Sequence, residues 1–126
     1  MRNLCTEQVP ASEIYERRDI IREKMRKNGI SAYICFNPDN IYYLTNFANF
    51  VHERPFILIL TAADIFFIIP RLERDHVERH KVGSLNLLEY AEFPATAGHR
   101  WSDRLIEVLP THGRIGCMPG VYQFHN

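Results

Sequence analysis

Hydrophobic residues near the start of the chain recur at a helical spacing. Ile14, Ile21 and Met25 fall on one face of a helix, and charged residues occupy the remaining faces. Ser12 stands where a helix N-cap is expected, and Gly29 stands where helices commonly end. The pattern therefore predicts a helix between these two residues, with its charged side chains in water.

Five short runs rich in apolar residues are typical of β-strands. They cover residues 30–36, 55–60, 65–69, 85–90 and 114–118. Four residues separate the second run from the third, which favours an antiparallel hairpin. Both runs of this hairpin are almost continuously apolar, so we expect helices or a partner surface to cover both of its faces.

Three further segments have helical patterns. Turn-forming residues at 37–40 supply N-cap candidates for a short helix around residues 41–44. Residues 72–80 also favour a helix, and apolar residues at a helical spacing predict another one over residues 101–109. This order of helices and strands predicts an α/β fold with a mixed β-sheet flanked by helices.

Length and composition limit the kinds of protein this chain can be. Its 126 residues and mass of 14.8 kDa fit one domain. Fifteen Lys and Arg residues balance fifteen Asp and Glu residues, which argues against a nucleic-acid partner because such binding needs a positive surface. The sequence has no apolar run long enough for a membrane helix and no secretory signal, so we expect a cytoplasmic protein without a membrane partner.

The three cysteines do not form a recognisable motif. Cys5, Cys35 and Cys117 are odd in number, far apart and without a Cys-x-x-Cys pair. Because Cys35 and Cys117 lie in strand-like runs, we expect buried thiols in a reducing compartment rather than disulfides or zinc ligands.

Two histidines form the pattern that most resembles a metal site. His76 and His80 are one helical turn apart, as in some zinc enzymes. The nearest acid, Glu78, lies between them and on the opposite side of the helix, so the third ligand is missing. We therefore expect an ordinary exposed helix here and no metal. Phosphate-binding glycine loops and nucleophile motifs are also absent from the sequence.

Three motifs together resemble the N-terminal domain of the creatinase, prolidase and aminopeptidase P family. They are Asn-Ile-Tyr-Tyr-Leu-Thr-Asn-Phe at 40–47, His-Glu-Arg-Pro at 52–55, and Pro-Arg-Leu-Glu at 70–73. The likeness extends over residues 12–118. One departure is Asn46, where many relatives have glycine, and asparagine also tolerates the left-handed backbone of such a turn.

The resemblance implies a ribonuclease H-like α/β domain that occupies residues 1–126 alone. In the family a C-terminal pita-bread domain follows, and we expect it to be absent from this chain. That domain holds two divalent metal ions (Mn, Co or Zn) through two Asp, one His and two Glu, and hydrolyses Xaa-Pro bonds or creatine. Hydrolysis of this kind needs its ligands in one place, so we expect neither activity nor a cofactor from this chain alone.

Two functions are open at this point. The first is a non-catalytic N-terminal domain of an Xaa-Pro peptidase (aminopeptidase P or prolidase-like) or a creatinase-like hydrolase, serving oligomerisation and capping of the active site. Its partners would be a second copy in a homodimer, the catalytic domain of the same parent protein and the peptide substrate. The alternative is a freestanding peptide- or protein-binding module without a catalytic partner.

The resemblance also nominates binding residues. In creatinase-like relatives an arginine at the start of the hairpin reaches the neighbouring subunit's active site and holds the substrate carboxylate, and Arg54 is its best match here. His52 and Phe50 are weaker candidates beside it. The alternative for Arg54 is an ordinary surface pair with Glu53 or another acid.

Aromatic residues after the first strand nominate an interface. Tyr42, Tyr43 and Phe47 are candidates for contact with a second subunit, because the family uses this domain between subunits. The alternative is an aromatic corner buried within the monomer.

Overall fold

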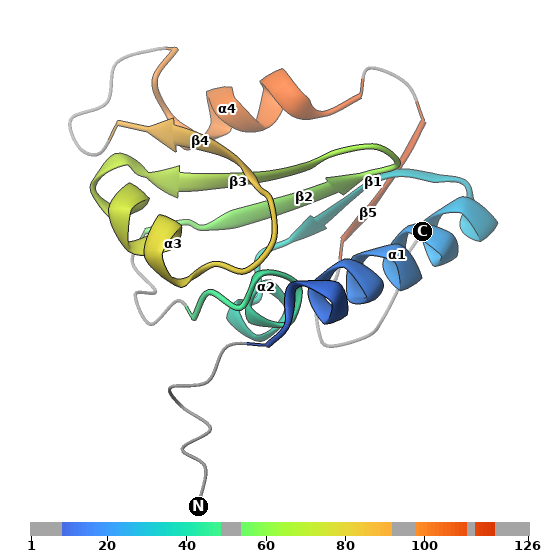
Figure 1. Ribbon diagram of the computed structural model, residues 1–126. Coiled ribbons are helices and arrows are strands. Elements are labelled where there is room, and N and C mark those ends of the chain that lie inside the picture. Colours follow the sequence, from blue (N-terminus) through green and yellow to red (C-terminus); the bar gives the residue numbers. More distant parts are fainter. Residues whose placement is uncertain (1–8, 49–53, 92–97, 111–112, 118–126) are drawn as a thin grey trace, which may run out of the picture.

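The computed structural model describes residues 9–48, 54–91, 98–110 and 113–117. Figure 1 shows how the helices and strands of these ranges are arranged. In chain order they are α1 (Ala11–Asn28), β1 (Ile30–Cys35), α2 (Pro38–Thr45), β2 (Ile57–Thr61), β3 (Ile65–Pro70), the 3-10 turn η1 (Arg71–Glu73), α3 (Arg74–His80), β4 (Asn86–Tyr90), α4 (Trp101–Val108) and β5 (Arg114–Cys117).

Within the described ranges, five strands form one mixed sheet with the order β4-β3-β2-β1-β5. Strand β2 runs antiparallel to β1 and β3, whereas β4 lies parallel to β3 and β5 lies parallel to β1. The carboxyl ends of β1, β3, β4 and β5 therefore meet at one edge of the sheet, which we call the carboxyl edge. This topology confirms the predicted α/β fold with a mixed sheet.

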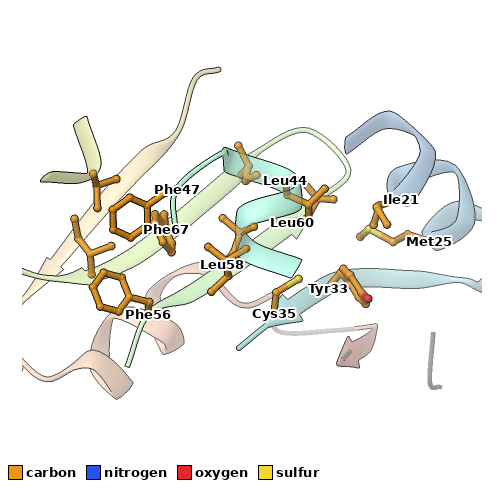
Figure 2. Packing of buried hydrophobic residues seen from close by; sticks show 14 of the residues in the cluster. Ile21, Met25, Tyr33, Cys35, Leu44, Phe47, Phe56, Leu58, Leu60 and Phe67 are labelled. Carbon is orange, nitrogen blue, oxygen red and sulfur yellow. The ribbon is translucent and has the colours of Figure 1, made fainter. Parts of the chain in front are cut away.

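Side chains of the central strands alternate between two hydrophobic clusters. In β3, Phe67 and Ile69 belong to a cluster that includes residues of α1, α2 and α3, whereas Ile68 belongs to a cluster packed against α4. Figure 2 shows the first cluster, with Ile21 and Met25 of α1 beside the strands. Both faces of the hairpin are covered, which confirms the prediction and explains why its strands are apolar at nearly every position.

The ends of α1 are defined by a proline and a glycine. The predicted N-cap role of Ser12 is wrong, because the helix begins at Ala11 and its N-cap residue is Pro10. The Pro10 backbone (φ −59°, ψ 144°) is extended, and its carbonyl accepts a hydrogen bond from the Glu13 N–H. Gly29 adopts a left-handed backbone with φ of 66°, which confirms the predicted helix end.

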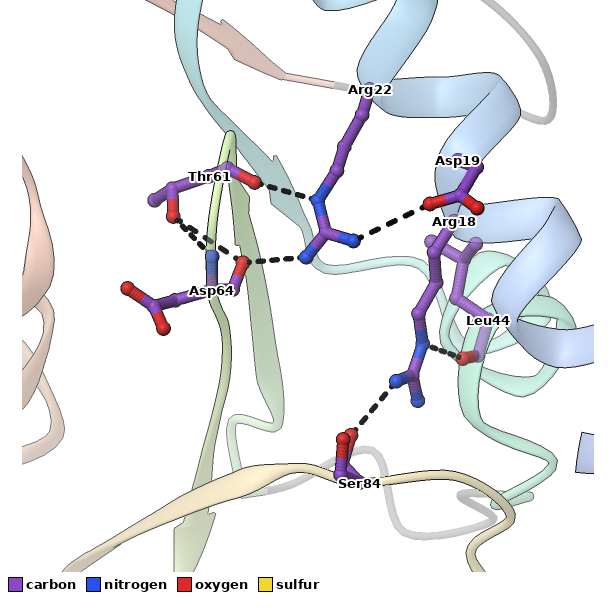
Figure 3. Close-up of polar contacts among 7 residues, drawn as sticks. All are labelled: Arg18, Asp19, Arg22, Leu44, Thr61, Asp64 and Ser84. Atoms are coloured by element: carbon purple, nitrogen blue, oxygen red, sulfur yellow. Dashed lines mark hydrogen bonds and ion pairs between the residues drawn. The ribbon is translucent and has the colours of Figure 1, made fainter.

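Arg18 is an exception to the prediction that the charged residues of α1 lie in water. It is 1% exposed. Its Nε donates to the Leu44 carbonyl at 3.0 Å and its Nη1 to the Ser84 carbonyl at 2.8 Å (Figure 3), while Nη2 donates to the Val82 carbonyl at 3.4 Å. A guanidinium has five N–H donors and no acceptor, so backbone carbonyls can satisfy it without a carboxylate. Arg18 thus ties α1 to α2 and to the segment before β4.

Asparagines define both ends of α2. The Asn37 side chain accepts hydrogen bonds from the N–H groups of Asp39 and Asn40, as an N-cap residue does. Asn46 follows the helix with a left-handed φ of 64°. The predicted short helix and the predicted tolerance of asparagine at this turn are both confirmed.

The helix α4 lies on the second face of the sheet. Leu105 and Val108 pack against the cluster on that face, whereas Ile106 is 72% exposed. The C-terminal strand then pairs with β1 from Arg114 onward. Across the ranges that the structure describes, we find no helix with the length and apolar character that crossing a membrane requires.

Candidate functional site

Arg54 lies at the carboxyl edge, three residues before β2 begins. The chain is held there because the Tyr90 hydroxyl, at the end of β4, donates to the Pro55 carbonyl at 3.0 Å. The Arg54 side chain reaches the segment after β3, where its Nη2 lies 3.0 Å from Oε2 of Glu73. These two side chains are 29% and 18% exposed. The pair is therefore more shielded from water than an ordinary surface ion pair, which contributes little.

Glu73 contacts a second partner. It ends η1, the turn that follows Pro70 and directs the chain from β3 into α3. Its other oxygen, Oε1, lies 3.1 Å from Nδ1 of His76 in the first turn of α3. A carboxylate only accepts hydrogen bonds, so Nδ1 is the donor in this contact. Glu73 thus bridges Arg54 and His76, and we call these three residues the Arg54 cluster.

The His76 side chain of the Arg54 cluster packs against the hydrophobic core. The His76 ring meets the Phe47 ring edge to face, with 5.2 Å between the centroids. Phe47 is 1% exposed and packs against Phe56 and Phe67 at centroid distances of 5.7 and 5.9 Å. On its other side His76 meets the His80 ring at 4.9 Å. Because Phe47 is fixed in the core, this contact restrains the position of His76.

A second charged group lies next to the Arg54 cluster. Glu89, near the end of β4, pairs with Arg71 at 3.7 Å and with Arg74 at 2.5 Å. The Glu89 carbonyl accepts a hydrogen bond from Nε of Arg104 in α4. The carboxyl edge therefore carries several arginines, which suit recognition of carboxylates because the planar guanidinium can form two parallel hydrogen bonds.

His76 and His80 do not assemble a metal site with other described residues. Their rings pack edge to face against each other. Within the described ranges, no group of three or more His, Cys, Asp or Glu side chains is placed to hold a metal ion. A dinuclear centre needs converging carboxylates and histidines, so the described residues do not fit the metal pair that the resemblance implies for the catalytic domain.

The predicted binding residues are only partly within the description. Phe50 and His52 lie in residues 49–53, outside the described residues, as does the predicted acid partner Glu53. Arg54 pairs with an acid, as its alternative interpretation anticipated, but that acid is Glu73. Its role in substrate binding stays a prediction.

The three predicted interface residues differ in exposure. Tyr42 is 42% exposed on α2. Tyr43 is half-buried, and the Arg17 guanidinium lies over its ring at 4.5 Å from the centroid. Phe47 is a core residue, so of these three predicted residues the two tyrosines offer surface to a partner. Their contact with a second subunit stays a prediction.

Sequence reasoning did not anticipate the roles of Glu73 and His76. In the sequence, Glu73 belongs to the Pro-Arg-Leu-Glu motif and His76 to a histidine pair, and neither pattern predicts a contact between them. The spacing of these two residues, i and i+3 across the start of a helix, is the signal that could have linked them. The link to Arg54 spans 19 residues and depends on how β2 and β3 pair.

Two hollows lie at the opposite edge of the sheet, near the turn between β2 and β3. They measure about 410 and 490 Å³, and Ser31 and Ala62 line both. Arg22 and Arg26 line the smaller one. Arg22 donates to backbone carbonyls of the hairpin turn (Figure 3), and Arg26 pairs with Glu23 on its own helix. Neither hollow is lined by a residue that the sequence analysis nominated for binding, so the Arg54 cluster is the stronger candidate site.

Comparison with protein families gives one extensive match. The family model for the creatinase/prolidase N-terminal domain matches residues 17–126. None of the curated protein sequences compared with the chain matches it.

Several solved structures share the fold. The creatinase/prolidase N-terminal domain of an X-Pro dipeptidase from Streptococcus pyogenes is 23% identical, with a TM-score of 0.68, and the match covers 82% of this chain and 76% of that one. A proline dipeptidase from Streptococcus pneumoniae TIGR4 is 20% identical with a TM-score of 0.62, and the match covers 76% of this chain and 67% of that one. The prolidase from Pyrococcus horikoshii OT3 is 17% identical with a TM-score of 0.64, and the match covers 84% of this chain but 26% of the prolidase. At these identities the likeness supports the fold alone.

Proposed function

Because the chain belongs to the family of creatinase/prolidase N-terminal domains, we propose that it is the non-catalytic N-terminal domain of an Xaa-Pro dipeptidase or a related hydrolase. The match over residues 17–126 carries this proposal. The reaction class is taken from structures that share the fold, which are an X-Pro dipeptidase domain, a proline dipeptidase and a prolidase. In this proposal, catalysis and the two divalent metal ions belong to a second domain of the parent protein.

The proposed work of the domain is to join subunits and to cap an active site. Arg54 would bind the free carboxylate of the peptide, as a guanidinium does through charge-assisted hydrogen bonds. Three features support this role. Arg54 lies at the carboxyl edge, its side chain is 29% exposed, and its partner Glu73 gives it a defined direction. The pair of tyrosines on α2 would contribute to the subunit contact.

The gene offers a direct test of the domain assignment. We expect the natural reading frame to continue beyond codon 126 into a segment that encodes two Asp, one His and two Glu as metal ligands. A natural stop codon at that point would contradict the proposal and favour a freestanding peptide- or protein-binding module.

Kinetics of the parent enzyme test the role of Arg54. Arg54→Ala should raise KM for Xaa-Pro dipeptides, because up to about 2 kcal/mol of binding free energy is lost. The value of kcat should change little. The matched control is Arg26→Ala, which breaks the exposed Arg26–Glu23 pair on α1. A substrate with an amidated C-terminus should show no effect of Arg54→Ala. Unchanged KM for the free dipeptide, with the fold intact by circular dichroism, would remove Arg54 from the site.

A further inference from the structure

Two prolines face each other where the pairing of β2 with β3 ends. Ile57 of β2 is paired with Ile68 of β3, and the same antiparallel register two residues further places Pro55 opposite Pro70. Proline has no backbone N–H group, so neither residue can donate a sheet hydrogen bond to the other. The pairing with β3 therefore begins only at Ile57, and the residues just before it need another anchor.

The hydrogen-bonding pattern of the hairpin shows what is lost at this position. In an antiparallel ladder, hydrogen-bonded pairs alternate with pairs that are not hydrogen-bonded. At the hairpin turn the Thr61 N–H donates to the Asp64 carbonyl, and steps of two residues from this pair lead to position 55 opposite position 70. In the regular pattern the Pro55 carbonyl would therefore accept from the N–H of residue 70, which a proline lacks.

Tyr90 supplies a donor from the next strand. It lies at the end of β4, where it is paired with Pro70, and β3 separates it from the segment that leads into β2 (Figure 1). Its hydroxyl reaches past β3 and donates to the Pro55 carbonyl at 3.0 Å. Tyr90 is 4% exposed and belongs to the cluster on the face of the sheet that α4 covers. The Pro55 carbonyl is thus held by a side chain that is itself fixed in the core.

The next residue of the segment is held from the opposite face of the sheet. Phe56 is 3% exposed and packs against Phe47 and Phe67 at centroid distances of 5.7 and 6.0 Å (Figure 2). These rings belong to the first cluster, whereas Tyr90 belongs to the second. The backbone that follows Arg54 is therefore fixed by ring packing on one face and by a hydroxyl on the other.

We propose that Tyr90 is a positioning residue for Arg54, because its hydroxyl fixes the Pro55 carbonyl and thereby sets where the Arg54 backbone lies at the carboxyl edge. The Pro55 ring fixes its own φ and restricts the residue before it to extended backbone, so few torsions separate Arg54 from the anchored carbonyl. This inference rests on the proposed role of Arg54 in binding a peptide carboxylate. It deepens that role by adding a residue that would not touch the ligand. The anchor acts on the backbone, whichever groups contact the Arg54 guanidinium.

NMR of the 126-residue chain tests the anchor directly. Tyr90→Phe keeps the ring and removes the hydroxyl, so the heteronuclear NOE of the Arg54 backbone amide should fall. The Pro55 carbonyl carbon should also shift upfield, because it loses a hydrogen bond. The matched control is Tyr15→Phe, which removes a hydroxyl that accepts from the Ser84 N–H at 2.9 Å and should leave both signals unchanged. Circular dichroism verifies that each variant retains the fold.

Kinetics of the parent enzyme test whether the anchor acts through Arg54. Tyr90→Phe should raise KM for free Xaa-Pro dipeptides about three- to tenfold, with kcat unchanged and with no effect on a dipeptide amidated at its C-terminus. In an Arg54→Ala background, Tyr90→Phe should raise KM no further, since the two residues then act as one unit. Tyr15→Phe should leave KM unchanged in either background.

Two results would overturn the proposal. Unchanged NMR signals in Tyr90→Phe would show that its hydroxyl does not hold the segment. An equal rise of KM with and without Arg54, or for both kinds of dipeptide, would show a general structural role that does not act through the arginine. The proposed function fails separately, if Arg54→Ala alone leaves KM unchanged, and the NMR result then still decides whether Tyr90 fixes the Arg54 backbone.

Discussion

Arginines of α1 act mainly on backbone carbonyls of other elements. Arg18 donates hydrogen bonds to three carbonyls. Arg17 donates to the Tyr43 carbonyl at 2.9 Å, and Arg22 donates to the Thr61 carbonyl at 2.9 Å. Burial lowers the pKa of the Arg18 guanidinium from its ordinary value, while the charge interaction with Tyr15 raises it. Arginine nevertheless stays charged in proteins, so each of these contacts is a charge-assisted hydrogen bond.

Removing Arg18 should destabilise the domain strongly. In Arg18→Met the carbonyls of Leu44, Val82 and Ser84 lose their donor, and we expect the free energy of unfolding to fall by about 3 kcal/mol. Arg18→Lys should cost less than Arg18→Met but more than the control, because a single ammonium cannot reproduce the planar fork. Urea unfolding followed by circular dichroism measures these values.

The control for Arg18 is an arginine on the same helix with a carboxylate partner. The Arg26 side chain is 71% exposed and pairs with Glu23, so Arg26→Met should cost less than about 1 kcal/mol. Equal losses in Arg18→Met and Arg26→Met would contradict the importance of the buried carbonyl contacts.

At the scale of elements, the end of α2 depends on the backbone of one residue. Asn46 has a φ of 64°, and its side-chain amide donates to the His80 carbonyl at 3.3 Å, which links α2 to α3. Asn46→Gly loses this amide contact but adopts the left-handed backbone without strain. Asn46→Ala loses the same contact and adopts this backbone only at an energetic cost. Asn46→Ala should therefore be less stable than Asn46→Gly by about 1 kcal/mol in thermal unfolding. A glycine variant less stable than the alanine variant would contradict this account.

The helix α4 offers an internal comparison between neighbouring residues. Leu105 packs against the cluster on the second face of the sheet, and Ile106 is 72% exposed. Leu105→Ala should lower the free energy of unfolding by about 2 kcal/mol, because it removes packed methyl groups and leaves a cavity. Ile106→Ala should change it by less than about 0.5 kcal/mol. Similar losses in both variants would mean that α4 is rotated about its own axis, so that Ile106 also faces the sheet.

The sequence predicted those features that depend on neighbouring residues. Gly29 and Asn37 mark helix ends through their own backbone and side chain, so their signals are local. The burial of Arg18 was missed because its acceptors lie 26 to 66 residues away, and a charged residue on a helix is usually exposed. The Arg54 cluster was likewise only partly predictable, since Glu73 reaches Arg54 only after β2 and β3 pair.

At the scale of the whole molecule, polar groups with candidate functions gather at one edge of the sheet. The carboxyl edge holds the Arg54 cluster and the arginines around Glu89, whereas the two faces of the sheet are devoted to packing. Ligand sites in α/β sheets commonly lie outside the carboxyl ends of the strands. The same edge also exposes aromatic surface, since Phe36 directly follows β1 and is 48% exposed.

This exposed aromatic surface leads to a prediction about self-association. Phe36 and Tyr42 both belong to the segment that leaves β1 at the carboxyl edge, and Tyr42 is 42% exposed. Aromatic residues are enriched at subunit contacts, so we predict a weak homodimer of the 126-residue chain through this segment. Sedimentation equilibrium at about a few hundred micromolar should detect it, because an interface smaller than the usual stable size binds weakly.

Tyr42→Ser and Phe36→Ser should each shift the mass toward the monomer. The control is Ile106→Ser, which removes an even more exposed apolar side chain on α4 and should leave the dimer unchanged. A monomeric wild type, or equal weakening by Ile106→Ser, would show that the segment after β1 does not form a specific contact.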